Sequence, residues 1–506
     1  MAEDARVQNR GLLTVCVMLA TIMQALDTTI ANVALPYMQG SLGATLDQIN
    51  WVLTSYIVAA AIMMPVTGFL VARFGRKKLF LVTVAGFTVA SVLCGMAASL
   101  EQMVLFRLLQ GVFGAPLVPM SQAVLLDSYP KERHGSAMAI WGVGVMVGPI
   151  LGPTLGGYLT EVYNWRWVFY INLPVGILTF LGLSAFLSES GLRKIRFDWF
   201  GFLALSVAIG SFQMMLDRGE QLDWFSSPEV VLELVLAALA LYLFLVHTFT
   251  ADHPFIDPHM FKDRNFSLGL ICIFMVGIIL LATLALLTPY LQNLMGYPVL
   301  TAGILLAPRG IGTMVAMMMV GRLINVIDAR LLVLIGLLLT AYVLWEMTGY
   351  TPAVSQQTLI IQGVLQGAGL GFMFVPLSTI TFATLPAKFR TEGTALFSLM
   401  RNIGSSIGIS LVIFLLTRNT QIMHSTLVEQ VTPFNQALRD PAVSHIWNMA
   451  SVAGRTALNA EVTRQATIVA YNNDFKLMMI IALAAVPFIF LLRRAQPVAG
   501  EAAVLE

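Results

Sequence analysis

The chain has 506 residues, of which 58% are hydrophobic and 11% are charged, and its mean hydropathy is +0.80. Soluble domains carry about 25% charged residues, so this composition excludes a soluble globular protein and indicates a protein of the lipid bilayer. The net charge of +2 says little about partners, but the basic residues lie in short clusters between apolar runs, so no nucleic-acid partner is expected. The three cysteines, Cys16, Cys94 and Cys272, fall in apolar runs, and neither disulfides nor a metal site are expected.

About fourteen apolar runs are long enough to cross a bilayer, which takes about 20 residues each. Because the bilayer offers no water to the backbone, each run is predicted to be helical. The polar start of the chain leads into the first run without a small-residue cleavage motif, so no cleavable signal peptide is expected. The predicted spans are 11–36, 50–71, 78–98, 103–126, 136–160, 168–187, 198–216, 230–250, 266–292, 301–321, 331–349, 357–385, 394–417 and 475–492.

Lysine and arginine gather in alternate connections between these spans, as they do in the cytoplasmic loops of membrane proteins. Arg166 and Arg218 are the exceptions in the connections between. Both termini are therefore predicted to be cytoplasmic, which agrees with an even number of spans. The basic clusters are Arg73 with Arg76, Lys77 and Lys78; Lys131 with Arg133; Arg193 with Lys194 and Arg196; Lys262 with Arg264; Arg322 with Arg330; Lys388 with Arg390; and Arg493 with Arg494.

Short sequence matches recur in register between the two halves of the chain and align the first span with the ninth. Parallel repeats of this kind are typical of major facilitator transporters, which bind substrate between their halves near the midplane. The matches pair Leu35–Gln39 with Thr288–Gln292, Gly68–Lys77 with Gly321–Arg330, Gln110-Gly111 with Gln366-Gly367, and Val118–Ser121 with Val375–Ser378.

The chain is therefore predicted to be an all-α polytopic membrane protein with the major facilitator fold. Residues 1–190 are expected to form an N-terminal six-helix bundle, 191–262 two inserted transmembrane helices, and 263–506 a C-terminal six-helix bundle. A long polar connection at about 418–473 falls on the outer face and shows a helical rhythm through Thr456–Tyr471. It is either a solvated helical hairpin without a role or a docking surface for an extracytoplasmic partner.

Asp27 lies near the middle of the first span, where insertion scales give an aspartate a cost of about 2.5–3.5 kcal/mol. Ionisable residues at such a depth usually face a bundle interior or a wet cavity. The deep ionisable residues are predicted to be Asp27, Arg107, Arg309 and Arg401, which makes Asp27 the only deep acid. Further acids, Glu101, Glu233, Glu346 and Glu392, lie near span ends.

Two roles are open for Asp27. Burial favours the protonated carboxyl and a nearby cation favours the carboxylate, so an aspartate between these influences is suited to load and release a proton. The alternative is a fixed pair with an arginine that only holds two helices together. Leu280 stands at the corresponding position of the second half, so a proton-binding role belongs to the first half alone.

Arg107 shares a helix face with Gln110, Gly111 and Gly114 and stays charged at any plausible pH. It is either the partner that tunes Asp27 or an anchor to backbone carbonyls. The three deep arginines leave the interior with an excess of positive charge, which favours hydrophobic anions or weak acids among the substrates. Proton coupling is assigned to Asp27 and Arg107, and the predicted substrate-cavity residues are Met23, Gln24, Ala31, Gln110, Arg309 and Arg401.

A glycine stripe runs along the fifth span, where small residues recur every four positions and allow close packing of helices. Pro149 and Pro153 should bend this span because each removes a helix hydrogen bond. The stripe is either ordinary tight packing or a bent contact that seals and opens the cavity. Its members are Gly144, Gly148, Pro149, Gly152, Pro153, Gly156 and Gly157.

No residue set indicates an enzyme. A Gly-x-x-x-x-Gly-Lys-Ser/Thr loop is missing, so ATP-driven transport by this chain alone is not expected. None of the six histidines lies deep in a span near a serine or cysteine nucleophile. No cofactor is expected, and a proton gradient is the expected source of energy.

Several segments resemble the motifs of a known family. Gly68–Lys77, with Gly68, Arg73, Gly75, Arg76 and Lys77, resembles the cytoplasmic loop motif of the major facilitator superfamily, although Ala72 stands where that motif usually has an aspartate. Leu105–Gly111 and Gly144–Gly157 are similar to its helix 4 and helix 5 motifs, the latter associated with antiporters. Leu26–Pro36 resembles the helix 1 motif of the fourteen-helix drug:proton antiporters, and Trp165–Pro174 and Met215–Ser227 resemble the EmrB-type multidrug exporters.

The resemblance implies export of hydrophobic toxicants across a bacterial inner membrane, driven by proton influx. It also implies a periplasmic adaptor protein and an outer-membrane channel as partners, for which 418–473 is the expected docking segment. Two other functions stay open at this point. One is an importer or specific metabolite exporter of the same fold, and the other is a non-transporting scaffold or sensor.

Overall fold

The computed structural model describes residues 10–130, 133–189, 191, 196–432, 435, 438, 446–447 and 449–493, and these residues contain helices but no strands. The helices of the first part are α1 (Arg10–Leu42), α2 (Leu46–Ile49), α3 (Trp51–Met63), α4 (Thr67–Phe74), α5 (Arg76–Met96), α6 (Leu100–Gly114), α7 (Leu117–Ser128), α8 (His134–Val162), α9 (Trp167–Tyr170) and α10 (Asn172–Phe186). Next come α11 (Trp199–Arg218), η2 (Trp224–Ser226), α12 (Pro228–Thr250) and η3 (Pro258–Lys262). The last part holds α13 (Arg264–Pro289), η4 (Tyr290–Leu294), α14 (Val299–Leu323), α15 (Ala329–Met347), α16 (Gln356–Ala383), η5 (Ala387–Phe389), α17 (Arg390–Val428), α19 (Val452–Ala484) and α20 (Val486–Leu491).

The predicted all-helical fold with about fourteen spans is confirmed. Thirteen helical stretches among the described residues are long and apolar enough to cross a membrane. The pair α3 and α4 makes a fourteenth span that is bent by 57°. Pro65 lies in the short break between the two helices, and proline is a common cause of such kinks because it removes a backbone hydrogen bond.

The helices α17 and α19 extend far beyond the spans predicted for them. The prediction ended one span at 417 and began the other at 475, whereas α17 continues to Val428 and α19 starts at Val452. Hydropathy marks the end of the membrane, but a helix ends where breakers occur. Neither glycine nor proline occurs in 409–428 or 455–484, so both helices run on through polar sequence. The helical rhythm predicted for Thr456–Tyr471 is confirmed.

Helices of the first part pack mainly on one another, and so do those of the last part. α1 packs against α8, α10 and α7, and α6 packs against α3 and α5. In the last part α13 packs against α17, and α16 packs against α14 and α15. The two parts meet along a seam where α8 contacts α14 and α7 contacts α17, and α11 contacts both α3 and α17.

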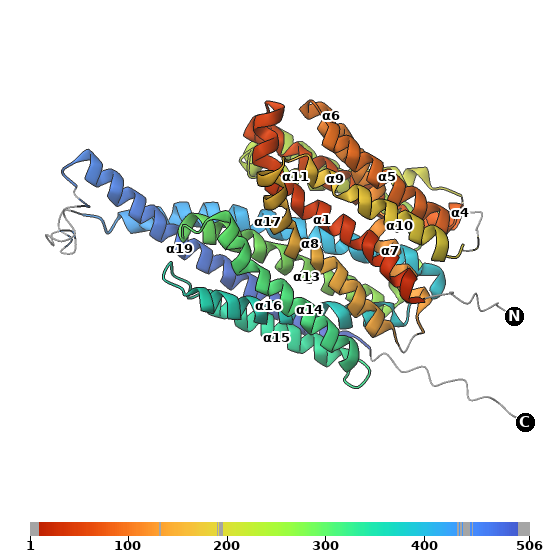
Figure 1. Cartoon of the computed structure of the whole chain (residues 1–506). Helices are drawn as coiled ribbons and strands as arrows, with labels where there is room; N and C mark the ends of the chain where they lie inside the picture. Colours follow the sequence, from red (N-terminus) through yellow and green to blue (C-terminus); the bar gives the residue numbers. More distant parts are fainter. Residues whose placement is uncertain are drawn as a thin grey trace, which may run out of the picture.

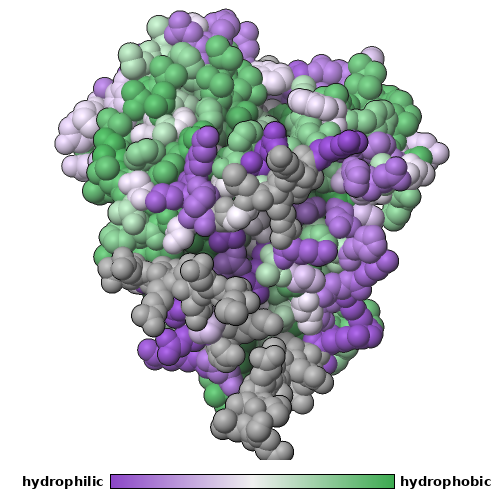
Figure 2. Space-filling model, turned by 90° about the vertical axis from the view of Figure 1, so that its right-hand side faces the viewer, coloured by the Kyte–Doolittle hydropathy of each residue, from purple (hydrophilic) through white to green (hydrophobic). Residues whose placement is uncertain are grey.

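The two ends of the molecule differ in character. The described chain begins and finishes at one end, here called the termini end, and α17 and α19 project from the opposite end, here called the hairpin end (Figure 1). Seen from the termini end, hydrophilic residues gather over the middle of the surface, and hydrophobic residues dominate its upper left side (Figure 2). This distribution fits an end that faces water beside flanks that face lipid.

Polar contacts close the seam at the termini end. Asp127 of α7 pairs with Arg390 of α17 at 2.6 Å and with Arg76 of α5 at 2.5 Å. The Ser136 hydroxyl donates to the carbonyl of Gly321 at 3.1 Å, which ties α8 to α14.

The predicted loop motif lies beside this closure. Arg76 makes the ion pair described above, and the Lys77 amide donates to the Glu189 carboxylate at 3.1 Å. Gly75 has a φ of +89°, a backbone conformation that glycine adopts without steric cost, and it forms the turn between α4 and α5. Gly68 lies against α17, where a Cβ atom on Gly68 would be 3.0 Å from the Cβ of Glu392, and Arg73 is exposed.

Candidate functional site

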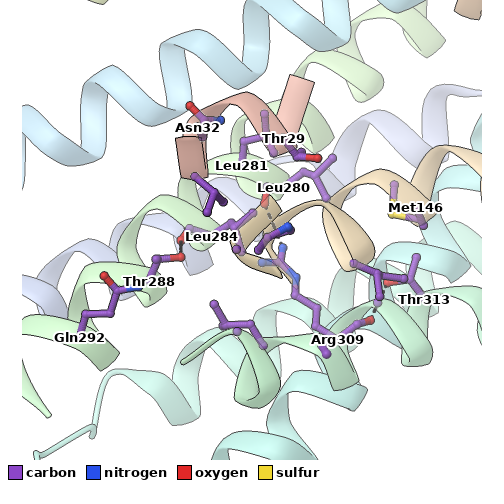
Figure 3. Close-up of a pocket in the computed structure, with 18 of the residues that line it drawn as sticks. Thr29, Asn32, Met146, Leu280, Leu281, Leu284, Thr288, Gln292, Arg309 and Thr313 are labelled. Carbon is purple, nitrogen blue, oxygen red and sulfur yellow. Dashed lines mark hydrogen bonds between the residues drawn. The ribbon is translucent and has the colours of Figure 1, made fainter. Parts of the chain in front are cut away.

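A cavity of about 660 Å³ opens at the seam, in the half of the molecule nearer the hairpin end. That volume lies within the range of ligand pockets, about 300–1,000 Å³. Side chains of α1, α8, α13 and α14 form its walls, as Figure 3 shows. Most of the lining is apolar, and the polar lining residues are Thr29, Asn32, Tyr37, Thr160, Glu161, Thr288, Gln292, Arg309 and Thr313.

Behind this cavity, Asp27 forms an ion pair that is sealed from solvent. The carboxylate of Asp27 is 0% exposed and its Oδ2 accepts from Nη1 of Arg107 at 2.7 Å. Its Oδ1 accepts from the side-chain amides of Gln110 at 2.8 Å and Asn172 at 3.1 Å. Every carboxylate oxygen therefore has a donor, which is the condition under which a buried charge is tolerated.

Arg107 is held on three further sides. Its Nε donates to the carbonyl of Val52 at 3.0 Å, and its Nη1 also donates to Gln110 Oε1 at 2.8 Å. Its guanidinium lies 4.3 Å from the ring centre of Tyr56, a favourable cation–π contact. α6 approaches α3 closely because Gly111 has no side chain, since a Cβ atom there would lie 2.9 Å from the Cβ of Ala59.

The ion pair and the cavity lie on different faces of α1. Thr29, two residues after Asp27, lines the cavity and its hydroxyl donates to the carbonyl of Gly148 on α8 at 3.0 Å. Asp27 does not line the cavity and instead joins α1 to α6 and α10. Any movement of α1 that changes the Asp27 contacts therefore also moves a wall of the cavity.

Of the six residues predicted to line the substrate cavity, only one does so. Arg309 lines the cavity, whereas Met23, Gln24, Ala31, Gln110 and Arg401 do not. The prediction placed the cavity on the face of α1 that carries Asp27, but that face packs inside the first part of the chain. The face of α1 that lines the cavity consists of Thr29, Asn32, Val33, Pro36 and Tyr37.

These other residues have local packing roles. Met23 and Ala31 are buried, and the Gln24 amide donates to the Tyr56 hydroxyl at 3.2 Å. Gln110 belongs to the Asp27 ion-pair cluster. The guanidinium of Arg401 on α17 lies 5.9 Å from the ring centre of Phe374 on α16.

The glycine stripe of α8 forms the contact with α1. A Cβ atom at Gly144, Gly152 or Gly156 would meet the side chain of Met18, Thr29 or Ile30, respectively. A Cβ atom at Gly148 would meet the backbone carbonyl of Ala25 first. Gly157 has no atom within 4 Å of its Cβ position, and with Pro153 it lines the cavity. Pro149 lies within α8, but its side chain is outside the described structure.

A second buried acid, on α19, was missed by the prediction. Asp474 is 1% exposed on α19, and neither of its oxygens has a hydrogen-bond partner among the described residues. The predicted span began one residue later, so Asp474 was assigned to the outer loop. Asn172 was also missed as a partner of Asp27, although a polar residue at the start of an apolar run was the available signal.

Within the described residues, no group of three or more histidine, cysteine, aspartate or glutamate side chains is placed to hold a metal ion.

Comparisons with known proteins agree with this geometry. The family model of the Major Facilitator Superfamily matches residues 17–409. The chain is 36% identical over 473 residues to the multidrug export protein EmrB of Escherichia coli K12, covering 92% of this chain and 91% of EmrB. It is 37% identical over 477 residues to the fatty acid resistance protein FarB of Neisseria gonorrhoeae, covering 94% of each chain.

Solved structures show the same fold at low sequence identity. The human organic anion transporter MFSD10 matches with a TM-score of 0.57 at 14% identity, over 93% of this chain and 99% of that chain. The proton:xylose symporter XylE matches with a TM-score of 0.58 at 12% identity, over 94% of this chain and 95% of XylE. The chain is thus a multi-pass membrane transporter rather than an enzyme, and it belongs to the Major Facilitator Superfamily as an EmrB-type multidrug exporter.

Proposed function

We propose that the chain exports hydrophobic compounds, weak acids among them, in exchange for protons that bind at Asp27. The observation that carries this proposal is the ion pair of Asp27 and Arg107, which is buried on the face of α1 away from the cavity. Intramembrane acids with a charged partner mark proton relays in pumps and transporters.

The proposed coupling follows from the contacts of α1. A proton on Asp27 removes the charge that holds Arg107, and the donors from α6 and α10 then lose an ionic acceptor. Because Asp27 is fully buried here, proton exchange requires α1 to move relative to those helices. Since the opposite face of α1 lines the cavity, the same movement alters the substrate site, which is the differential contact that coupling requires.

The seam is closed by ion pairs at the termini end and has a cavity nearer the hairpin end, which supports a cycle that alternates between outward-facing and inward-facing states. With the hairpin end outside and the termini inside a bacterial inner membrane, the cavity near the hairpin end corresponds to an outward-facing state. In the inward-facing state the ion pair of Asp127 with Arg390 would have to separate, since it joins α7 to α17 at the termini end. Proton entry from outside would favour substrate release and the return inward, and deprotonation inside would restore affinity for substrate.

The test is transport by the purified chain in lipid vesicles that are acidic inside. A neutral hydrophobic dye is the right cargo, because a pH gradient alone does not redistribute it. Protons leaving the vesicles should drive accumulation of the dye, and an ionophore that exchanges potassium for protons should abolish it. Equal accumulation with and without the gradient would contradict proton coupling.

The projecting parts of α17 and α19 support a further element of the proposal, docking of a periplasmic adaptor that leads to an outer-membrane channel. Ile422 and Val428 on α17 and Val452 on α19 are 45%, 43% and 72% exposed in this extension. Both helices extend past the spans predicted for them, to Val428 and from Val452, so this segment is within reach of a partner outside the membrane.

Shortening the projection tests this element. Removal of 421–460 with a short Gly/Ser connection should leave dye transport by vesicles within about twofold of native, because the cavity lies elsewhere. The same variant should lose resistance to the exported compounds in cells. Full resistance in cells, with the shortened chain present at native abundance, would show that no partner docks there.

A further inference from the structure

Arg309 and Gln366 form an incomplete counterpart of the Asp27 cluster in the second half of the chain. Gln366-Gly367 on α16 repeats Gln110-Gly111 on α6, and the residue that repeats Asp27 is Leu280. In place of Asp27 the second half therefore offers only a hydrophobic side chain. A glutamine next to a buried arginine is present in both halves, but among the described residues a carboxylate bonded to the arginine is found only in the first.

The cation of the second half comes from a different helix. Arg309 on α14 extends towards α13, and its Nη2 donates to the carbonyl of Leu280 at 2.9 Å (Figure 3). Gly363 on α16 lies beside it, since a Cβ atom there would be 3.9 Å from the Cβ of Arg309, an ordinary van der Waals contact. Arg309 thus points at the backbone of the residue that replaces Asp27.

Three polar atoms at this place have no partner among the described residues. They are Nη1 of Arg309 and both Oε1 and Nε2 of Gln366. Arg309 is 8% exposed and Gln366 is 0% exposed, so bulk water does not satisfy them. Leaving such groups unpaired costs about 1–3 kcal/mol each, and more for a charged group.

Both side chains also line a second, small cavity of about 10 Å³ directly behind the main one. Arg309 and Leu306 line both cavities, so the two cavities adjoin at these side chains, and a ligand that occupies both displaces the Leu306 side chain. A cavity of about 10–15 Å³ has room for one water-sized group, and therefore for one oxygen of a carboxylate. The main cavity in front of Arg309 is largely apolar and large enough for the rest of an amphiphile.

We propose that Arg309 and Gln366 bind the acid group of an anionic amphiphile whose apolar part fills the main cavity. The ligand carboxylate takes in the second half the place that the Asp27 carboxylate takes in the first, with a guanidinium and a primary amide as donors in both. Charge-assisted hydrogen bonds of this kind are about twice as strong as neutral ones. This assignment rests on the proposed export function, because it names the residues that select its acidic substrates.

Equilibrium binding without any gradient separates this assignment from proton coupling. The probes are dodecanoate and dodecanamide, which have the same chain length and differ in charge, measured at pH 8 with the purified chain in detergent. The native chain should bind dodecanoate about tenfold or more tightly than dodecanamide. The variant Asp27→Asn should keep this preference even though it loses coupling, so failure of either proposal is recognised separately.

Two substitutions decide the role of the pair. Arg309→Gln should abolish the preference for dodecanoate while leaving dodecanamide binding within about twofold, and Arg309→Lys should restore part of it. Gln366→Glu supplies an internal carboxylate to Arg309, so it should raise the melting temperature and weaken dodecanoate binding about tenfold. Arg401→Gln is the matched control and should keep the preference for dodecanoate, because Arg401 does not line either cavity.

Three results would overturn the assignment. The first is equal affinity of the native chain for the two probes. The second is a folded Arg309→Gln variant that keeps the preference for dodecanoate. The third is a Gln366→Glu variant that binds dodecanoate as tightly as the native chain does.

Discussion

Replacing Asp27 by asparagine is expected to reduce pH-gradient-driven dye transport to the level of protein-free vesicles. Asparagine has nearly the same shape but neither binds a proton in this pH range nor carries a charge. The substitution also leaves Arg107 buried without its counter-charge, and breaking a buried ion pair in this way costs about 3–5 kcal/mol. The free energy of unfolding should therefore fall together with transport.

A double-mutant cycle separates the two effects of this substitution. The variant Asp27→Asn/Arg107→Gln removes both charges, so it should recover most of the lost stability, because no unpaired charge remains. Its transport should nevertheless stay at background. If the double variant regained gradient-driven transport, the ion pair would serve only to hold α1 to α6.

Replacing Gly148 by alanine is expected to have the second large effect, about 1–3 kcal/mol of lost stability with loss of transport. A Cβ atom at Gly148 would lie 2.8 Å from the Cβ of Ala25 and closer still to the Ala25 carbonyl. Backbone atoms of α1 cannot move aside without shifting the helix that carries Asp27. Thermal melting of the purified variant in detergent measures the first effect, and vesicle transport the second.

Gly157→Ala is the matched control on the same helix. No atom lies within 4 Å of the Cβ position at Gly157. The free energy of unfolding should therefore change by about 0.5 kcal/mol or less, and the melting temperature should stay close to that of the native chain. If both alanine variants were equally stable, the stripe would not be the close contact between α8 and α1 that the structure shows.

Much of the fold was predictable from the sequence because the bilayer imposes simple rules. Apolar runs of sufficient length gave the number of spans, and the bent pair of α3 and α4 was recognised as one run. The ends of α17 and α19 were not predictable from hydropathy, because a helix continues into water wherever no residue breaks it. The boundaries predicted for the two bundles and the inserted helices remain predictions.

The site was predictable to a smaller extent. A charged residue in an apolar run is easy to recognise in the sequence. Asp27, Arg107 and Arg309 could therefore be found, because a charge inside the membrane has a high free-energy cost. The face of α1 that lines the cavity could not be predicted, because both faces carry apolar residues. Ala31 packs inside the first part of the chain, while Val33 lines the cavity. Gln366 was visible only as a repeat of Gln110, and its lack of hydrogen-bond partners depends on side chains that come together from distant parts of the sequence.

The central claim, obligatory exchange of substrate for protons through Asp27, is tested most directly by running the exchange in reverse. Vesicles at equal internal and external pH are loaded with the neutral dye and diluted, and a pH indicator inside them is followed. As the dye leaves through the native chain, protons should enter and acidify the interior, whereas vesicles with Asp27→Asn should show no acidification. Dye efflux through the native chain without acidification, or equal acidification with Asp27→Asn, would contradict the account.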